Sequence, residues 1–128
     1  MIYEGSCHCG LVTFEVETSD SVEVENCNCS ICQMSGFLHL IVPKENFRLI
    51  TGENNLSTYK FNTGVAEHKF CKVCGIKSFY IPRSNPDGVD VNLRCLKVKP
   101  KNVKVIDFDG QNWELNAHRV AHKSKSTL

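Results

Sequence analysis

Eight cysteines in 128 residues constrain this chain more than any other feature, because seven of them stand in short-spaced groups. The groups are Cys7-His8-Cys9, Cys27-Asn28-Cys29-Ser30-Ile31-Cys32 and Cys71-Lys72-Val73-Cys74, and the eighth cysteine, Cys95, stands alone. Thiolates at such spacings are typical zinc ligands, four in a closed structural site and three in a catalytic site that keeps one position open. Two pairs and one triplet therefore predict one site of each kind.

A disulfide framework is the alternative, because eight cysteines could form four bridges. The N-terminus, Met1-Ile2-Tyr3-Glu4-Gly5, has neither a basic nor an apolar signal region, and no apolar run approaches the roughly 18 residues of a membrane span. We therefore expect a cytoplasmic protein. In that compartment, clustered cysteines bind metal or react more often than they form disulfides.

The composition is that of one ordinary globular domain, which we place over residues 1–128 with a core over about 3–116. Apolar residues make up 41% of the chain, charged residues 23%, and the formal net charge is +1. A balance this close to neutral gives no electrostatic reason to expect a nucleic-acid or membrane partner. The basic segment from His118 to Lys125 is short, and we expect it to be a solvated or frayed tail.

The hydrophobic pattern predicts a mainly β protein with little helix. Short apolar or alternating runs recur with turn signals between them, which is typical of an all-β architecture. The expected strands cover residues 11–17, 22–25, 37–42, 47–50, 57–61, 67–70, 78–81, 89–93 and 103–108. Two short helices are expected, one over 31–35 with Ser30 as its N-cap and Gly36 as its end, and one within 113–122.

The closed site is expected to contain Cys7, Cys9, Cys71 and Cys74. Each pair is followed by a glycine, which admits the left-handed backbone that turns around a metal often need. The metal would join two distant parts of the chain and would stabilise the fold. The alternative is that one or both pairs are free buried thiols. His8, between two ligands, is expected at the surface or beside the metal ligands.

The open site is expected to contain Cys27, Cys29 and Cys32, with a small thiol as the substrate, because sulfur competes well for a soft zinc centre. Two alternatives stay open. A fourth ligand from Cys95, His39 or His68 would make a second structural zinc, or the triplet would be a redox-active thiol cluster. Cys95 itself is either a buried thiol, a ligand or a reactive neighbour of this site. His39, on an apolar strand, is expected to be a core histidine.

The order of three motifs, CHCG, CNCSIC and FCKVCG, followed by SFYIPRSNPDG, resembles the glutathione-dependent formaldehyde-activating family over residues 3 to 116. The segments TYKFNTGVAEHKFCKVCG and SFYIPRSNPDG look most like its centromere protein V branch. That branch has a long extension before the domain. This chain lacks the extension, so roles that depend on it are not expected to carry over.

The resemblance implies a β-tent fold of small antiparallel sheets around two zinc ions, one structural and one open. It also implies an activity, the formation or breakdown of S-hydroxymethylglutathione from glutathione and formaldehyde, which is a carbon–sulfur lyase reaction. Arg83, Lys72 or Arg94 could bind the carboxylates of glutathione. The alternatives are a zinc-anchored module that binds a thiol or a partner without turnover, and a scaffold in which both zinc sites are closed.

Overall fold

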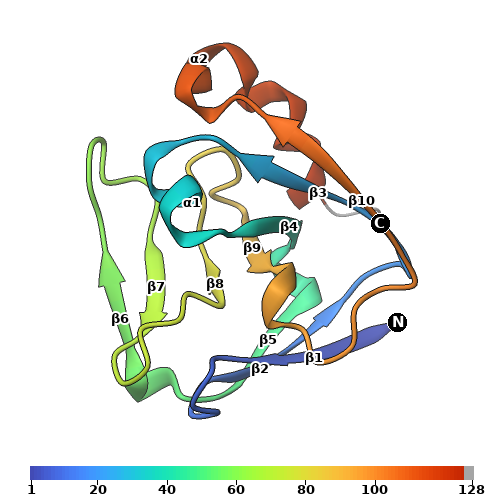
Figure 1. Cartoon of the computed structure of the whole chain (residues 1–128), viewed down its shortest axis with the longest axis vertical. Coiled ribbons are helices and arrows are strands. Elements are labelled where there is room, and N and C mark those ends of the chain that lie inside the picture. The colour runs from blue at the N-terminus through green and yellow to red at the C-terminus, as the bar shows by residue number, and fades with distance from the viewer. Residues whose placement is uncertain (126–128) are drawn as a thin grey trace.

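The fold is mainly β, as predicted, and is described for residues 1–125 of a computed structural model (Figure 1). Its strands form three small sheets. The first sheet has the order β1 (Ile2–Ser6), β2 (Thr13–Glu17), β5 (Phe47–Thr51). The second has the order β10 (Asn102–Phe108), β3 (Ser21–Cys27), β4 (Leu38–Pro43), β9 (Gly88–Asn92), β8 (Phe79–Tyr80). The third is the hairpin of β6 (Leu56–Tyr59) and β7 (His68–Cys71).

Helical structure is short, in agreement with the sequence. Helix α1 (Ser30–Ser35) ends at Gly36, whose φ of 66° is the left-handed conformation expected of a C-terminal glycine. Its N-cap is Cys29, one residue before the predicted Ser30. Helix α2 (Trp113–Asn116) has only four residues, and two 3-10 turns, Ala117–Arg119 and Ala121–Ser124, follow it in place of a longer helix within 113–122.

One strand pair differs from the small antiparallel sheets that the resemblance implied. Strands β10 and β3 run parallel and pair along their full lengths, from Asn102 opposite Ser21 to Phe108 opposite Cys27. A parallel pair needs a long crossover, and most of the chain lies between these two strands. The pairing matters for the site because it places the end of β10 beside the first cysteine of the triplet.

Alternation along the strands gives the five-stranded sheet two different faces. Leu40 and Val42 of β4 pack into the main hydrophobic core, together with Val89 and Val91 of β9. Successive side chains of a strand point to opposite faces, so His39 and Ile41 of β4 lie on the other face. On that face Ile41 belongs to a second, smaller cluster with Phe108 and Val120. One face is thus the core, and the other is the floor of the site described below.

The main core joins the first sheet to the second through aromatic contacts. Phe14 of β2 stacks on Phe47 of β5 with ring centroids 5.5 Å apart and meets Phe79 of β8 edge-on at 6.3 Å. Val12 and Val16, both fully buried, pack beside Phe14 in the same cluster. Such buried aromatic pairs contribute on the order of 1 kcal/mol beyond their buried area.

Strand β1 is the one that the pattern did not predict. It pairs with β2 from Ile2 opposite Glu17 to Ser6 opposite Thr13. Only Tyr3 among its large side chains is buried, and Gly5 lies directly under the Phe14 ring, where an added Cβ would come within 2.2 Å of Cζ. A glycine inside a five-residue strand weakens the alternation of apolar and polar residues by which a strand is predicted. The pairing of β1 with β2 therefore depends on packing against the rest of the fold rather than on the local sequence of β1.

The C-terminal segment is not the frayed tail that was expected. Its residues Val120 and Ser124 are buried, and the amide of Asn85 donates hydrogen bonds to the carbonyl oxygens of Val120 and Ala121 at 2.9 and 3.1 Å. Lys123 pairs with the buried Glu25 of β3. The segment therefore packs against the floor of the site. The residues after this segment, 126–128, lie outside the described part of the chain.

The turn between β5 and β6 provides a test of this packing. Gly52 has a φ of 94°, and a Cβ added there would lie 2.4 Å from the carbonyl oxygen of Leu11. Gly64 has a similar φ of 72° but nothing within 4 Å of an added Cβ. We expect Gly64→Ala to lower the free energy of unfolding by about 1–2 kcal/mol, the cost of a left-handed alanine, and Gly52→Ala by at least about 3 kcal/mol. Urea denaturation of both variants measures this, and equal losses would contradict the packing of this turn.

Candidate metal centres and the cavity beside them

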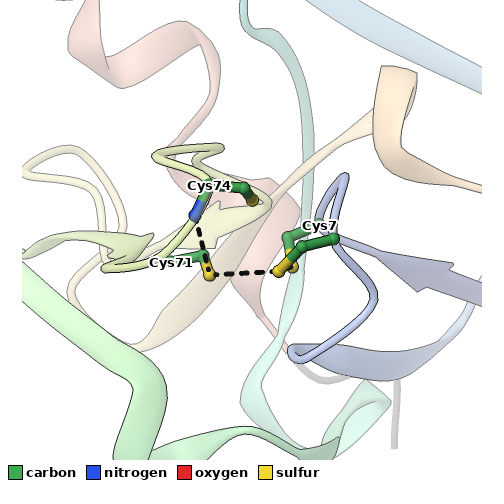
Figure 2. Close-up of side chains that lie close together, drawn as sticks. Cys7, Cys71 and Cys74 are labelled. Atoms are coloured by element: carbon green, nitrogen blue, oxygen red, sulfur yellow. Dashed lines mark hydrogen bonds between the residues drawn. The ribbon is translucent and has the colours of Figure 1, made fainter.

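The first cysteine cluster joins the two pairs that the sequence grouped together. Ligand atoms of Cys7, Cys9, Cys71 and Cys74 all lie within 4.8 Å of one another. Figure 2 shows Cys7, Cys71 and Cys74 drawn together at this cluster. The sulfurs of Cys7 and Cys9 are 3.6 Å apart, and those of Cys9 and Cys71 are 3.7 Å apart. The first pair follows β1 and the second stands at the end of β7, so the cluster ties the first sheet to the hairpin.

The donors of this cluster fit a closed metal site. Four sulfurs at these separations are the donor set of a tetrahedral structural zinc. The backbone N–H of Cys74 donates to the sulfur of Cys71 at 3.5 Å, and this hydrogen bond lowers the pKa of the Cys71 thiol. A lowered pKa favours the thiolate, which is the form that binds metal.

The second cluster is the triplet, which stands at the junction of a strand and a helix. Cys27 ends β3, Cys29 caps α1, and Cys32 lies within the first turns of that helix. The backbone N–H of Cys29 donates to the sulfur of Cys27 at 3.5 Å. The three sulfurs are thus brought together where β3 ends and α1 begins, without any unusual secondary structure.

Gly110 closes one side of this cluster. A Cβ added to Gly110 would lie 2.3 Å from the sulfur of Cys27 and 3.0 Å from the Cβ of Cys29. Only a residue without a side chain lets the backbone after β10 approach the sulfur so closely. No local sequence pattern indicates this role, since Gly110 stands far along the chain from the cysteine motifs.

His39 lies beside the triplet, and the other two candidates for a fourth ligand do not join it. Ligand atoms of Cys27, Cys32 and His39 lie within 4.8 Å of one another. Cys95 lies elsewhere. It packs against the cluster of Cys7 and Cys74, and burial followed by the charge of Cys7 raises its pKa to about 11. Cys95 is therefore not the reactive neighbour of the triplet that was considered.

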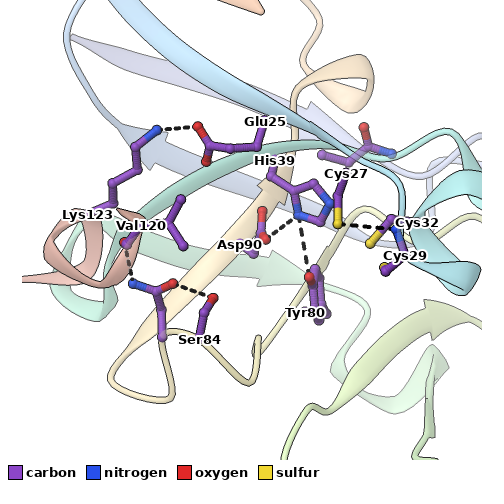
Figure 3. Close-up of polar contacts among 12 residues, drawn as sticks. Glu25, Cys27, Cys29, Cys32, His39, Tyr80, Ser84, Asp90, Val120 and Lys123 are labelled. Atoms are coloured by element: carbon purple, nitrogen blue, oxygen red, sulfur yellow. Dashed lines mark hydrogen bonds and ion pairs between the residues drawn. The ribbon is translucent and has the colours of Figure 1, made fainter. Parts of the chain in front are cut away.

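A row of polar side chains lies on the floor beneath the triplet. His39 Nδ1 is 2.5 Å from Asp90 Oδ2 and 3.4 Å from the hydroxyl of Tyr80 (Figure 3). Strand pairing explains the row, because Glu25 stands opposite His39, and Tyr80 stands opposite Asp90 on neighbouring strands. All four side chains are buried. Buried carboxylates and histidines are costly unless they are paired, so such a row suggests a function.

Of this row the sequence pointed only to His39, and Glu25, Tyr80 and Asp90 were not predicted as site residues. Asp90 stands between Val89 and Val91 in a strand with every residue buried. A charged residue inside a short strand of β-branched neighbours is the signal that could have found it, because charged side chains are rarely fully buried without a partner.

A cavity of about 410 Å³ opens beside the triplet. This volume is within the range of small-molecule sites. Its walls come from both ends of the chain, and its lining includes all three triplet sulfurs and the aromatic residues Phe61, Tyr80, Phe108 and Trp113. By contrast, none of the four cysteines of the first cluster lines it. The triplet thus borders the cavity and the first cluster does not. The closed and open coordination expected of the two clusters stays a prediction.

Arg83 is the one of three suggested carboxylate-binding residues that lines the cavity. Its guanidinium lies 3.7 Å from the centre of the Trp113 ring and 2.7 Å from Glu114 Oε1. Lys72 is exposed in the turn that follows β7, between Cys71 and Cys74, and Arg94 donates through Nε to the carbonyl oxygen of Gly36 at 3.0 Å. Neither of these two lines the cavity.

His68 forms part of the opposite wall. Its ring stacks on Tyr80 at 4.7 Å and on Phe61 at 5.3 Å, and its Nδ1 lies 2.8 Å from the ammonium of Lys77. Burial, and next the charge of Lys77, lower the pKa of His68 from 6.5 to about 4. His68 is therefore a neutral, stacked wall residue at neutral pH and accepts a hydrogen bond from Lys77.

Comparison with known proteins gives consistent matches. The model of a family described as "Glutathione-dependent formaldehyde-activating enzyme" matches residues 2–107. A Halomonas elongata protein named for the same family is 30% identical over 82 residues, which are 58% of this chain and 52% of that protein. The chain thus aligns with about half the length of this curated relative. A crystal structure of a Rhodobacter sphaeroides protein is 35% identical with a TM-score of 0.71, covering 80% of this chain and 99% of that one.

Over residues 1–125, the structure contains no helix that is long and apolar enough to span a bilayer.

The position of His68 predicts its titration. We expect its ring to titrate near pH 4, and Lys77→Met to raise that pKa toward 6.5 without reaching it, because burial remains. Between pH 6.5 and pH 4 the unfolded chain binds a proton at His68 and the folded chain does not. The free energy of unfolding therefore decreases as the pH falls through this range. Histidine NMR titration of both proteins measures this. An unchanged pKa in Lys77→Met would contradict the contact.

Proposed function

We propose that this chain, which belongs to the glutathione-dependent formaldehyde-activating family, is a zinc-dependent carbon–sulfur lyase that forms or breaks S-hydroxymethylglutathione. One observation supports this most strongly. The three sulfurs of Cys27, Cys29 and Cys32 line a cavity of small-molecule size, while the four-sulfur cluster stands apart from it. A closed and an accessible site in one domain suit one structural and one reactive zinc.

The proposed reaction joins a thiol and formaldehyde. The sulfur adds to the carbonyl carbon, a C–S bond forms as the C=O double bond becomes single, and the oxygen takes the proton that the thiol has lost. Zinc at the triplet would hold the substrate sulfur as a thiolate near neutral pH. The reverse reaction returns the proton to the sulfur as the C–S bond breaks.

The cavity walls would bind and orient the substrate. Phe61 and Trp113 provide apolar surface that excludes water. Trp113 and Glu114 hold the Arg83 guanidinium at the cavity wall. There a carboxylate of glutathione could replace the Glu114 carboxylate as the partner of Arg83. Stacking on Trp113 reduces the conformational freedom that Arg83 would lose on binding.

Other features are proposed on the same basis. We propose two zinc ions per chain, a single domain over residues 1–128 and a cytoplasmic location, since all eight cysteines are free thiols in the structure. Within the family, the segments around Cys71 and after Ser78 favour the centromere protein V-like branch. No observation supports a nucleic-acid partner, and the formal net charge of +1 does not favour one.

Exchange NMR on an equilibrated mixture of glutathione and formaldehyde tests the reaction. We expect catalytic amounts of the zinc-loaded protein to speed exchange between glutathione and its hydroxymethyl adduct. Cys29→Ser should reduce the catalysed rate at least about 100-fold, because removing a group that acts in the transition state costs several kcal/mol. Far-UV circular dichroism of this variant should remain that of the native fold.

Cys95→Ser is the matched control, because Cys95 is a free thiol that packs beside the first cluster and does not line the cavity. It should keep the native rate. Exchange at the spontaneous rate with the native protein would overturn the proposed activity and favour a zinc-anchored module that binds thiols without turnover.

A further inference from the structure

Part of the cavity wall comes from a segment beyond the family match. That match ends at residue 107, whereas residues 109–125 follow β10 and lead through α2 to the last 3-10 turn. Four residues of this segment line the cavity, namely Gly110, Gln111, Trp113 and Val120. The three sulfurs of the triplet lie within the matched region. Segment 109–125 thus completes a cavity around cysteines that it does not itself supply.

Contacts at both ends fix segment 109–125 in place. Near its start, the backbone of Gly110 lies against the sulfur of Cys27. Near its end, Lys123 pairs with the buried Glu25 of β3 (Figure 3). Between these two points, Val120 is buried. The segment is therefore a fixed wall of the cavity, and its side chains can determine which ligands bind.

The cavity differs in charge between its inner and its outer end. The side chain of Asp90, on the floor, is 1% exposed and that of Arg83, on the wall, is 28% exposed, so Arg83 lies nearer the solvent. Among the cavity-lining residues that the structure describes, Arg83 is the only lysine or arginine. Oδ1 of Asp90 and Oε1 of Glu25 have no hydrogen-bond partner within residues 1–125, so carboxylate acceptors remain at the inner end. A ligand carboxylate is therefore repelled from the floor and attracted to Arg83.

Segment 109–125 also determines how Arg83 is presented. The centre of the Trp113 ring lies 3.7 Å from the guanidinium carbon. This stacking holds the planar guanidinium in one orientation, so less conformational freedom is lost when a carboxylate binds. The present partner of Arg83 Nη2 is Glu114 Oε1, at 2.7 Å, on a side chain that is 77% exposed. An exposed ion pair is weak, so the carboxylate of a ligand can replace Glu114.

We infer that segment 109–125 selects the substrate of this cavity. Trp113 fixes Arg83 as the binding site for a carboxylate, and Glu114 lowers the affinity by occupying that site when no ligand is bound. The ligands that fit are thiols with a carboxylate far from the sulfur, because the two groups are then drawn to opposite ends of the cavity. Uncharged thiols bind less tightly. The inference rests on the proposed function, in which the cavity holds a thiol, and does not depend on turnover.

A purely structural wall makes a different prediction. Removing a side chain that only packs changes the free energy of unfolding and weakens all ligands alike. Removing a side chain that binds a carboxylate weakens only the ligands that carry one. Glutathione and its diethyl ester separate the two cases, because they share the thiol and the peptide backbone and differ only in the two carboxylates.

Calorimetric titration of the zinc-loaded native protein with these two ligands is the first test. We expect glutathione to bind about 5- to 20-fold more tightly than the diester, less than a buried ion pair provides, because Arg83 is partly exposed and Glu114 competes. Trp113 is the only tryptophan of the chain, so its fluorescence reports where the ligand binds and should change more with glutathione. Equal affinities, or no binding of either ligand, would overturn the proposal.

Variants assign the preference to named side chains. Arg83→Gln and Trp113→Leu should each reduce the preference for glutathione over the diester to about 2-fold or less, because the carboxylate partner is lost or no longer oriented. Glu114→Gln should tighten glutathione binding about 2- to 5-fold and leave the diester unchanged, because a weak competitor is removed. Weaker glutathione binding in Glu114→Gln would contradict the competition.

Leu115→Ala is the matched control, because Leu115 lies on the same short helix, is exposed and does not line the cavity. It should bind both ligands as the native protein does. If Trp113→Leu weakens both ligands equally and keeps the native preference, the segment is only a structural wall and the proposal is overturned.

The outcome is distinguishable from failure of the proposed function. A preference for glutathione over its diester, in a protein that does not speed glutathione exchange, would support the selection and overturn the lyase. Faster exchange with equal binding of the two ligands would do the reverse.

Discussion

Four sulfur atoms meet at one point from two distant parts of the chain, and the remaining architecture depends on that meeting. Cys9 and Cys71, 62 positions apart, bring their sulfurs to 3.7 Å. Thiolates repel one another, so a cluster of four is stable only when a cation lies among them. The loops that carry them follow β1 and β7, and so the first sheet, whose strand β1 has little apolar surface of its own, is tied to the hairpin that forms one wall of the cavity.

The second constraint is the two-sided character of the five-stranded sheet. Val89 and Val91 of β9 point into the core, and Asp90 between them points to the opposite face. The same alternation places His39 beside Asp90 on that face. Strand β9 thus stabilises the core with Val89 and Val91 and contributes Asp90 to the site. A shift of one residue in the β4–β9 register would exchange the two sets of side chains.

Much of this could be predicted from the sequence, because the signals are local. Cysteine spacing grouped Cys7, Cys9, Cys71 and Cys74 into one cluster apart from the triplet, and apolar alternation located every strand except β1. The helix start beside Cys29 was predicted to within one residue. These features depend on neighbours within a few positions, and short-range patterns report such neighbours well.

What the sequence did not reveal depends on long-range pairing. The approach of Gly110 to Cys27 follows from the parallel pairing of β10 with β3, which no local pattern encodes. The partnership of Asp90 with His39 needs the register of β4 against β9. The buried position of Val120 requires the amide of Asn85 to hold the last turns of the chain. In each case a residue of ordinary local appearance acquires its role from a strand or loop far away in the chain.

The central claim is that the two cysteine clusters do different work, one in folding and one in chemistry. The most direct test compares Cys71→Ser with Cys27→Ser by native mass spectrometry and thermal unfolding. We predict that Cys27→Ser stays folded with one zinc ion, whereas Cys71→Ser loses on the order of 10 kcal/mol of folding free energy and does not fold stably. A folded Cys71→Ser protein, or equal destabilisation in both variants, would contradict it.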